Sequence, residues 1–402
     1  MSARCVVYFS PVRFSSFWQR PHYMAAAMLA GPVDRMLWVD PYPTRLPRMT
    51  DVRRPSDVPR LPEARIPGVD VLSPLALPVE PLDVGQWINR HTFLRSVRNE
   101  IGAWLDGESY AIGVGKPSPL AIDALRTLGS SRRCAGRFYD VMDRYASFYR
   151  GLSSRAMAAW ENEMLPLCDW VQTSSTTLRS EIALRHRSVR LCLNGIDSKA
   201  IEQARRRAGR ATPAGGNGGL VFGYIGTMGG WFDWEWTFAL ARVLAQIDPQ
   251  AQVVLVGPMF EGPGTAIPPN VRILEPMSHA EALRTAASFD VGIIPFKFTP
   301  LTECVDPIKY YEYRGLGLPV LATAFGELRY KNDAALVLAD AGADLAACAR
   351  RALDLREAAS APLPLAEWTW SSRFAPLEGW LYSLGRRDNA RVADVEPAYT
   401  LS

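Results

Sequence analysis

Residues 305–320 read Val-Asp-Pro-Ile-Lys-Tyr-Tyr-Glu-Tyr-Arg-Gly-Leu-Gly-Leu-Pro-Val. Asp306 is a residue type that caps helix N-termini, and Pro307 suits a first helical turn. A glycine, Gly315 or Gly317, can end such a helix before the apolar residues that follow. The stretch therefore predicts a short helix that runs directly into a buried strand, which is the repeating step of an α/β fold.

The same step recurs along the chain. Apolar runs typical of strands lie at Cys5–Phe9, Arg35–Val39, Tyr110–Val114, Arg137–Val141, Trp170–Thr173, Val189–Leu193, Val221–Ile225, Gln252–Val256, Val291–Phe296, Pro319–Ala322 and Ala335–Leu338. Helical patterns separate most strands of the first half, at His22–Leu29, Gln86–Leu105, Pro119–Leu128, Ser153–Leu167 and Ser174–Arg185. This alternation predicts βαβ units and parallel sheets.

Changes in composition predict the domain borders. After Asn194-Gly195 the chain becomes rich in arginine and then in glycine, which is typical of a linker. We expect a Rossmann-like domain at 1–197, a linker at 198–219 and a second Rossmann-like domain at 220–370, facing each other across a central crevice. Ten prolines between Pro41 and Pro81 predict an irregular excursion, and the polar residues 386–402 predict a disordered tail.

The composition excludes several classes of protein. The chain has 402 residues, 45 basic against 41 acidic side chains, and 48% hydrophobic residues, which is a globular composition. No run approaches the roughly 20 apolar residues of a membrane-spanning helix, and the first residues lack a signal peptide, so we expect a cytoplasmic protein. Six scattered cysteines without a Cys-x-x-Cys pair argue against a zinc site or a disulfide framework.

The helix at 305–320 offers a seat for a diphosphate. Its first turn would present free backbone N–H groups and a partial positive charge. Lys309 and Glu312 are three residues apart and share one helix face. Lys309 could contact phosphate oxygens and Glu312 the two hydroxyls of a ribose. The alternative is an ordinary surface ion pair.

A glycine-rich turn follows the predicted strand at Val221–Ile225. It reads Gly226-Thr-Met-Gly-Gly230, and its glycines let backbone N–H groups approach an anion. The full spacing is Gly223-x-x-Gly226-x-x-Gly229 rather than Gly-x-Gly-x-x-Gly, which argues against a dinucleotide-binding oxidoreductase.

Two carboxylates stand at the end of the predicted strand at Arg137–Val141. Asp140 and Asp143 are three residues apart and could supply a general base or orient a substrate hydroxyl. A helix cap or a surface contact with Arg144 is the alternative.

The loop before the first predicted helix holds Arg20 and His22. These side chains could bind an anionic or hydroxylated acceptor, or they could anchor the loop and cap the helix. The other histidines, His91, His186 and His279, are isolated in the sequence and are interpreted as structural or solvated.

Three motifs resemble those of bacterial GT-B glycosyltransferases of the family-4 type, which make surface polysaccharides. They are Trp18-Gln-Arg-Pro-His22, Tyr139-Asp-Val-Met-Asp143, and Asp306-Pro-Ile-Lys-Tyr-Tyr-Glu-Tyr313 followed by Gly317-Leu-Pro-Val320. The resemblance extends over about residues 4–380. It implies an acceptor-binding N-terminal domain, a nucleotide-sugar-binding C-terminal domain, and a last helix, at 371–385, that crosses back to the N-terminal domain.

The resemblance also implies roles for single residues. Glu312 would hold the donor ribose and Lys309 a phosphate, with Pro307 in the same donor-binding motif. The loop Gly226-Thr227-Met228 would lie against the diphosphate, and Pro276-Met277 would meet the base.

The chain departs from the family pattern at two places. A Glu-x7-Glu motif would put its first glutamate at position 304, which is Cys304, with Glu303 beside it. The basic residue that often follows the glycine-rich loop is replaced by Gly229-Gly230-Trp231. Asp143, and after it Asp140, then becomes the candidate catalytic carboxylate.

The sequence thus favours a glycosyltransferase that needs no metal, because no Asp-x-Asp motif suited to a metal–diphosphate clamp is present. It would transfer a sugar from a nucleoside diphosphate to a glycan or lipid-linked acceptor with retained configuration. No cofactor is expected. A GT-B nucleotide-sugar epimerase and a non-catalytic partner subunit are the alternatives. No nucleic-acid partner is expected. Arginines of the first half could contact an anionic membrane if they share one face, namely Arg132, Arg133, Arg137, Arg185, Arg187 and Arg190.

Overall fold

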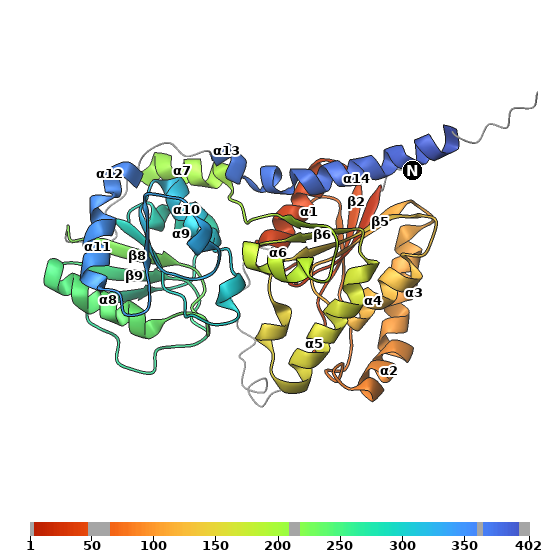
Figure 1. Ribbon diagram of the computed structural model, residues 1–402, viewed down its shortest axis with the longest axis horizontal. Helices are drawn as coiled ribbons and strands as arrows, with labels where there is room; N and C mark the ends of the chain where they lie inside the picture. The colour runs from red at the N-terminus through yellow and green to blue at the C-terminus, as the bar shows by residue number, and fades with distance from the viewer. Residues whose placement is uncertain (1–3, 47–64, 209–217, 360–364, 394–402) are drawn as a thin grey trace, which may run out of the picture. The chain divides into compact units, whose positions relative to one another are not determined.

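The computed structural model describes residues 4–46, 65–208, 218–359 and 365–393. The chain divides into two compact units, one formed by Met1–Cys192 with Arg373–Ser402 and the other by Leu193–Ser372. We call them the N-terminal unit and the C-terminal unit. Each consists of one parallel sheet with helices packed on it (Figure 1).

The sheet of the N-terminal unit has seven strands in the order β3-β2-β1-β4-β5-β6-β7. Every residue of β1 and β4 is buried, because helices cover both faces of the sheet. The strands are β1 Cys5–Phe9, β2 Arg35–Val39, β3 Val69–Leu72, β4 Tyr110–Val114, β5 Cys134–Val141, β6 Trp170–Thr173 and β7 Val189–Leu191. The helices are α1 Arg20–Ala30, α2 Asp83–His91, α3 Phe93–Leu105, α4 Pro119–Thr127, α5 Gly151–Met164 and α6 Thr176–Ala183, with 3-10 turns η2 Tyr145–Phe148 and η3 Leu165–Leu167.

The sheet of the C-terminal unit has six parallel strands in the order β10-β9-β8-β11-β12-β13. They are β8 Val221–Ile225, β9 Gln252–Val256, β10 Val271–Leu274, β11 Val291–Ile294, β12 Val320–Thr323 and β13 Leu336–Ala339. The helices are α7 Ser198–Ala208, α8 Trp234–Ile247, α9 His279–Ala286, α10 Ile308–Leu316, α11 Leu345–Asp354, α12 Arg356–Ala359 and α13 Leu365–Trp368, with 3-10 turns η4 Thr302–Cys304 and η5 Gly326–Tyr330.

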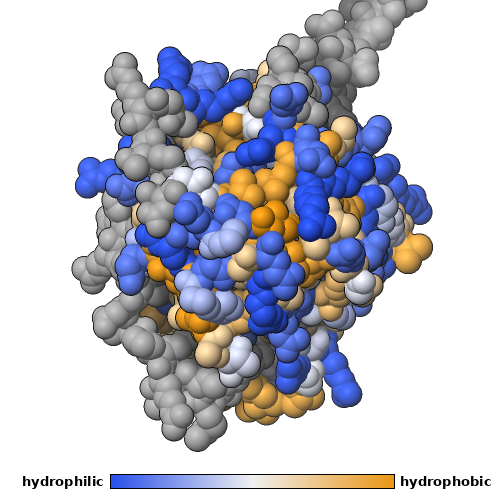
Figure 2. Space-filling model, turned by 90° about the vertical axis from the view of Figure 1, so that its left-hand side faces the viewer, coloured by the Kyte–Doolittle hydropathy of each residue, from blue (hydrophilic) through white to orange (hydrophobic). Residues whose placement is uncertain are grey.

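Helices α8 and α11 pack against each other and bury one apolar face. On α8 the buried residues recur every three or four positions, from Trp234 through Phe238 and Ala241 to Leu244. Figure 2 shows the outer side of this unit, where hydrophilic residues surround a narrow hydrophobic band. Both predicted Rossmann-like folds are therefore confirmed.

The last helix, α14 Trp370–Ala393, belongs to the N-terminal unit from Arg373 onward (Figure 1). The Trp380 ring lies 5.5 Å from the ring of Trp170 and 6.4 Å from that of Phe138. A Cβ on Gly136 would lie 2.8 Å from the Trp380 ring, so a glycine on β5 makes room for the helix. The predicted crossing back of the last helix is confirmed.

Replacing Trp380 by alanine is expected to lower the free energy of unfolding by about 1–3 kcal/mol, because the half-buried ring fills the space above β5 and β6. Urea denaturation of the full chain measures the change. Tyr382→Ala is the matched control, because this side chain of the same helix is 55% exposed and should cost less than about 0.5 kcal/mol. Equal losses for both variants would contradict the packing described here.

Two edge strands, β3 and β10, are absent from the sequence prediction. Each has four residues and exposed or half-exposed positions, so neither shows a continuous apolar run. β3 lies inside the proline-rich excursion, of which residues 47–64 are outside the described residues. The predicted helix Gln86–Leu105 is two helices, because the backbone at Thr92 is not helical and its hydroxyl donates to the Ile88 carbonyl at 2.6 Å.

The predicted linker is helical in its first half. α7 packs against α9 and α10 of the C-terminal unit and buries Ile201 and Ala204. The predicted tail is likewise helical up to Ala393, as the end of α14. Residues 198–208 and 386–393 are thus helical, and a sequence of linker composition that is rich in arginine can form an amphipathic helix. Residues 209–217 and 394–402 lie outside the described residues.

Candidate functional site

Helix α10 brings a carboxylate and two basic side chains together in the C-terminal unit. Glu312 is buried, and its Oε2 accepts a hydrogen bond from Lys309 Nζ at 2.8 Å. Its Oε1 accepts one from His279 Nε2 at 2.7 Å. The spacing of Lys309 and Glu312 predicted the first contact. The second joins residues that are 33 positions apart.

These two contacts set the charge of Glu312. Burial alone would raise its pKa, but the Lys309 ammonium and the His279 ring hold the pKa at about 2. The group is therefore a carboxylate at every physiological pH. A carboxylate has about four lone-pair positions, so two remain for hydroxyl groups of a ligand.

His279 is placed by the start of α9. Ser278 and Glu281 form a capping box, with the Ser278 hydroxyl accepting from the Glu281 N–H and the Glu281 carboxylate accepting from the Ser278 N–H. Met277, the predicted base contact, is half-buried beside this cap. The sequence indicated a structural or solvated role for His279, and the structure places its ring against the Glu312 carboxylate. The capping pattern that follows Pro276-Met277 was the available signal that this loop is fixed in place.

The glycine-rich turn lies against the same helix. Gly226 follows β8 with φ of +149°, a conformation that favours glycine. A Cβ there would lie 2.7 Å from the Tyr224 hydroxyl and 3.3 Å from Lys309 Cε. The prediction that Gly226 and Lys309 share a site is consistent with this contact.

The other two residues of the turn differ in exposure. Thr227 is half-buried, and its carbonyl accepts from the Tyr224 hydroxyl at 3.0 Å. Met228 is fully buried, and its N–H donates to the Pro258 carbonyl at 2.9 Å. The Met228 side chain therefore supports the turn from the core and does not face a donor.

Asp306 does not cap α10, in contrast to the sequence prediction. The helix begins at Ile308, and Pro307 occupies the N-cap position without a side-chain cap. The Asp306 carboxylate instead accepts from the Asn194 N–H at 2.7 Å and from the Tyr311 hydroxyl, with Lys331 Nζ at 3.4 Å. These donors offset the cost of burying the Asp306 carboxylate, which would be high without hydrogen-bond partners.

Position 304, where the resemblance would place a first glutamate, lies in η4. The Cys304 side chain is buried, while Glu303 beside it is exposed. A cysteine cannot supply the carboxylate of the family pattern at this position.

In the N-terminal unit, Arg20 and Asp140 form a buried ion pair. Arg20 Nε donates to Oδ2 at 2.9 Å and Arg20 Nη2 to Oδ1 at 2.7 Å, and Gln172 Nε2 donates to Oδ1 at 2.9 Å. The Arg20 and Asp140 side chains are only 2% and 0% exposed. This geometry corrects the prediction that Arg20 binds an acceptor and makes Asp140 its structural counter-ion.

His22 is also a structural residue. It is fully buried, its Nδ1 accepts from the Gln19 N–H at 3.2 Å, and its Nε2 lies 3.1 Å from the Phe14 carbonyl oxygen. Burial lowers its pKa. The predicted acceptor contact is therefore wrong in this structure, and the alternative of helix capping is correct, since Gln19 and His22 form the capping box of α1.

Asp143 differs from Asp140 in its exposure and in its hydrogen bonding. It follows β5 and is half-buried, and among the described residues it has no hydrogen-bond or ion-pair partner. Burial raises its pKa to about 7; Arg20 opposes the rise and Asp140 adds to it. A carboxyl group with such a pKa can exchange a proton near neutral pH, which suits a general base.

The described residues contain no group of three or more side chains suited to hold a metal ion. Within the same residues, no helix is long and apolar enough to cross a membrane. The structure thus gathers Gly226, Lys309, Glu312 and His279 in the C-terminal unit, and places Asp143, a carboxyl group with a raised pKa, in the N-terminal unit.

Comparison with known sequences gives one partial match. No protein-family model matches the chain. The putative teichuronic acid biosynthesis glycosyltransferase TuaH of Bacillus subtilis (strain 168) is 24% identical over 201 residues, which are 46% of this chain and 49% of that protein. The match therefore spans about half the length of this curated relative.

Comparison with solved structures covers nearly the whole chain. The sucrose-phosphate synthase of Thermosynechococcus elongatus aligns with a TM-score of 0.59 and 16% identity over 97% of this chain and 99% of its own. HepE of Anabaena, solved in complex with UDP, aligns with a TM-score of 0.54 and 13% identity over 98% and 100%. The α,α-trehalose 6-phosphate synthase of Burkholderia multivorans aligns with a TM-score of 0.55 and 14% identity, also over 98% and 100%. The chain has the GT-B fold.

Proposed function

We propose that this protein is a glycosyltransferase that moves a sugar from a nucleoside diphosphate sugar to a hydroxyl of a glycan or lipid-linked acceptor, in the synthesis of a surface polysaccharide. The observation that carries the proposal is the buried Glu312 carboxylate, held by Lys309 and His279 beside the Gly226 turn on a GT-B fold. The partial similarity to TuaH supports a role in polysaccharide synthesis.

Each side chain of this cluster then has a defined task. The free lone pairs of Glu312 accept the two ribose hydroxyls of the donor. The Gly226 and Met228 N–H groups already donate to the Val256 and Pro258 carbonyls. The Lys309 ammonium and the backbone N–H groups of Thr227 and of the first turn of α10 stabilise the diphosphate as it leaves. These groups supply the positive charge themselves, so the reaction is proposed to need neither a metal nor a cofactor.

Asp143 is the proposed catalytic carboxylate, which accepts the proton of the acceptor hydroxyl. Retained configuration, which enzymes with similar motifs show, requires that the acceptor oxygen bonds to the anomeric carbon from the same face that the diphosphate leaves, and NMR of the product's anomeric proton tests this. A cytoplasmic location is also proposed.

Fewer arginines support contact with a membrane than the sequence suggested. Arg137 pairs with Asp169 at 2.8 Å and Arg185 with Glu161 at 2.9 Å, and the Arg190 guanidinium lies 4.2 Å from the Trp170 ring centre. Arg132, Arg133 and Arg187 therefore carry the proposal. Flotation with anionic liposomes tests it, and equal recovery with neutral liposomes would remove it.

Glu312→Ala is expected to weaken nucleotide binding about tenfold to a hundredfold, because hydrogen bonds from the ribose to a charged group are lost. Calorimetric titration with UDP, GDP and dTDP measures the change and identifies the base. Glu235→Ala, which alters an exposed glutamate of the same unit, is the control and should bind like the wild type. Failure of the wild type to bind any of the three nucleotides would refute the proposed function. Product formation without an acceptor would indicate an epimerase.

A further inference from the structure

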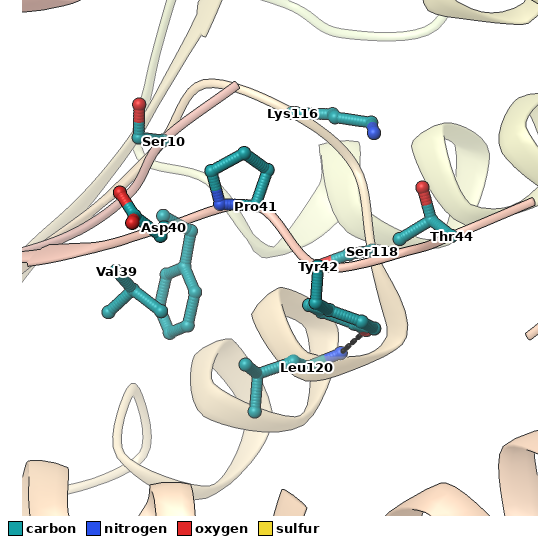
Figure 3. Close-up of a pocket in the computed structure, with 10 residues that line it drawn as sticks. Ser10, Val39, Asp40, Pro41, Tyr42, Thr44, Lys116, Ser118 and Leu120 are labelled. Carbon is teal, nitrogen blue, oxygen red and sulfur yellow. Dashed lines mark hydrogen bonds between the residues drawn. The ribbon is translucent and has the colours of Figure 1, made fainter. Parts of the chain in front are cut away.

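A small pocket opens in the N-terminal unit where β1, β2 and β4 end. Ser10 follows β1, Asp40 and Thr44 follow β2, and Lys116 and Ser118 follow β4 (Figure 3). In the sheet order β3-β2-β1-β4, strands β2 and β3 are added on one side of β1, and the next strand, β4, is added on its other side. Doubly wound sheets bind ligands at this switch point, beyond the carboxyl ends of the strands.

The Thr44 hydroxyl has no partner in this pocket. The side chain is 3% exposed, and its Oγ1 is buried without a hydrogen bond to any described residue. A buried hydroxyl without a partner is costly, and native structures rarely keep one. A ligand oxygen or a bound water would complete it.

Lys116 supplies a positive charge to the same pocket. Among the described residues no carboxylate pairs with it, and its Nζ lies 5.7 Å from the Tyr149 ring centre. Asp40 also lines the pocket, but its carboxylate already accepts from the Phe14 N–H, Trp38 Nε1 and the Ser73 hydroxyl. In Figure 3 Lys116 and Thr44 lie on the side of the pocket away from Asp40.

The pocket wall is held in place by the start of α4. The Tyr42 hydroxyl accepts from the Leu120 N–H at 3.2 Å, the contact drawn in Figure 3. Ser118 caps the helix by accepting from the Ala121 N–H at 3.2 Å. The positive end of this helix therefore adds to the charge of Lys116.

The pocket has about 20 Å³ of space, enough for one group the size of a water molecule. It can admit the oxygen of an acidic substituent but not a sugar ring. We propose that this pocket binds a carboxylate or phosphate group of the acceptor, through the Lys116 ammonium and the Thr44 hydroxyl. The inference rests on the proposed function, because it names the acceptor as an acidic saccharide.

The test compares neutral and acidic sugars on the full chain without donor. Methyl glucoside, methyl glucuronide and glucose 6-phosphate are titrated and followed by NMR. We expect at least one acidic sugar to bind about tenfold tighter than methyl glucoside, because it gains a charge-assisted hydrogen bond. Preference for the glucuronide would identify a carboxylate, and preference for glucose 6-phosphate a phosphate.

Variants of the pocket link this preference to its residues. Lys116→Met should remove the preference, Lys116→Arg should keep most of it, and Thr44→Val should weaken it. Lys199→Met and Thr127→Val, at exposed positions, are the controls. Thermal unfolding and UDP binding of each variant verify that both units are folded.

Two results would overturn the inference. Equal binding of neutral and acidic sugars by the wild type, including no binding of either, would mean that only water completes Thr44. A preference that survives in Lys116→Met would place the acidic group elsewhere. Failure of the wild type to bind any of UDP, GDP and dTDP would instead refute the proposed function, and this result is independent of the sugar titrations.

Discussion

Replacing Asp143 by asparagine is expected to lower kcat about 10²- to 10⁴-fold, the usual contribution of a general base. The affinity for the nucleotide should not change, because that site is built from α9, α10 and the Gly226 turn. Asparagine keeps the shape of the side chain but cannot accept a proton. Steady-state kinetics with saturating donor and calorimetry with the nucleotide separate the two effects.

The pH dependence gives a second test of Asp143. As the pKa of Asp143 is raised to about 7, wild-type kcat should fall as the pH drops below about 7, where the base becomes protonated. The residual activity of Asp143→Asn should not show this decrease at low pH. A wild-type rate that is flat between pH 6 and 8 would exclude Asp143 as the base.

The stability of the fold should depend on pH in the opposite direction to kcat. The folded carboxyl keeps its proton up to about pH 7, whereas in the unfolded chain it loses the proton near its ordinary pKa of 3.8. Wild-type stability attributable to this group therefore decreases as the pH rises from about 4 to 7, and Asp143→Asn should remove the decrease. Asp83→Asn, at an exposed position of the same unit, should change neither rate nor stability.

Replacing Arg20 by methionine is expected to lower the free energy of unfolding by about 3–5 kcal/mol. Asp140 is fully buried, and without Arg20 only the neutral Gln172 amide would remain of the partners described above. An uncompensated buried charge is far more costly than a missing surface contact. Urea denaturation of the full chain measures the loss.

A double variant tests whether the loss of stability comes from the unpaired buried charge of Asp140. Arg20→Met combined with Asp140→Leu should recover much of the stability, because both charges are then absent from the core. Arg185→Met, which breaks a partly exposed pair with Glu161, should cost less than about 1 kcal/mol. A similar small cost for Arg20→Met would show that the buried pair contributes little to the stability of the fold.

The buried pair also explains why the acceptor prediction failed for Arg20. In the sequence, Arg20 stands in a loop beside other polar residues, and nothing there indicates that it will form two hydrogen bonds with Asp140, 120 positions away. His22 was ambiguous for the same reason. Its capping partner Gln19 is local, but its burial results from packing against Trp38 of β2.

Local sequence was sufficient for much of the fold. β1, β2, β4, β6, β8 and β9 have the predicted bounds, because parallel strands buried on both faces show as continuous apolar runs. The strands β3 and β10 lack that signal, because exposed and half-exposed residues interrupt their apolar runs. The break at Thr92 was missed because helical periodicity continues on both sides of it, and the helix at Ser198–Ala208 because its arginine-rich composition is also typical of a linker.

The sequence by itself thus determined two α/β units, the returning last helix, and the Lys309–Glu312 pair, because each depends on periodicity or on spacing within one helix. Only the tertiary structure decided that His279 completes the Glu312 site, that Arg20 belongs to the core, and that Thr44 and Lys116 share a pocket. These contacts join segments separated by tens of residues, and their energies depend on burial, which exists only once the sheets and helices have packed.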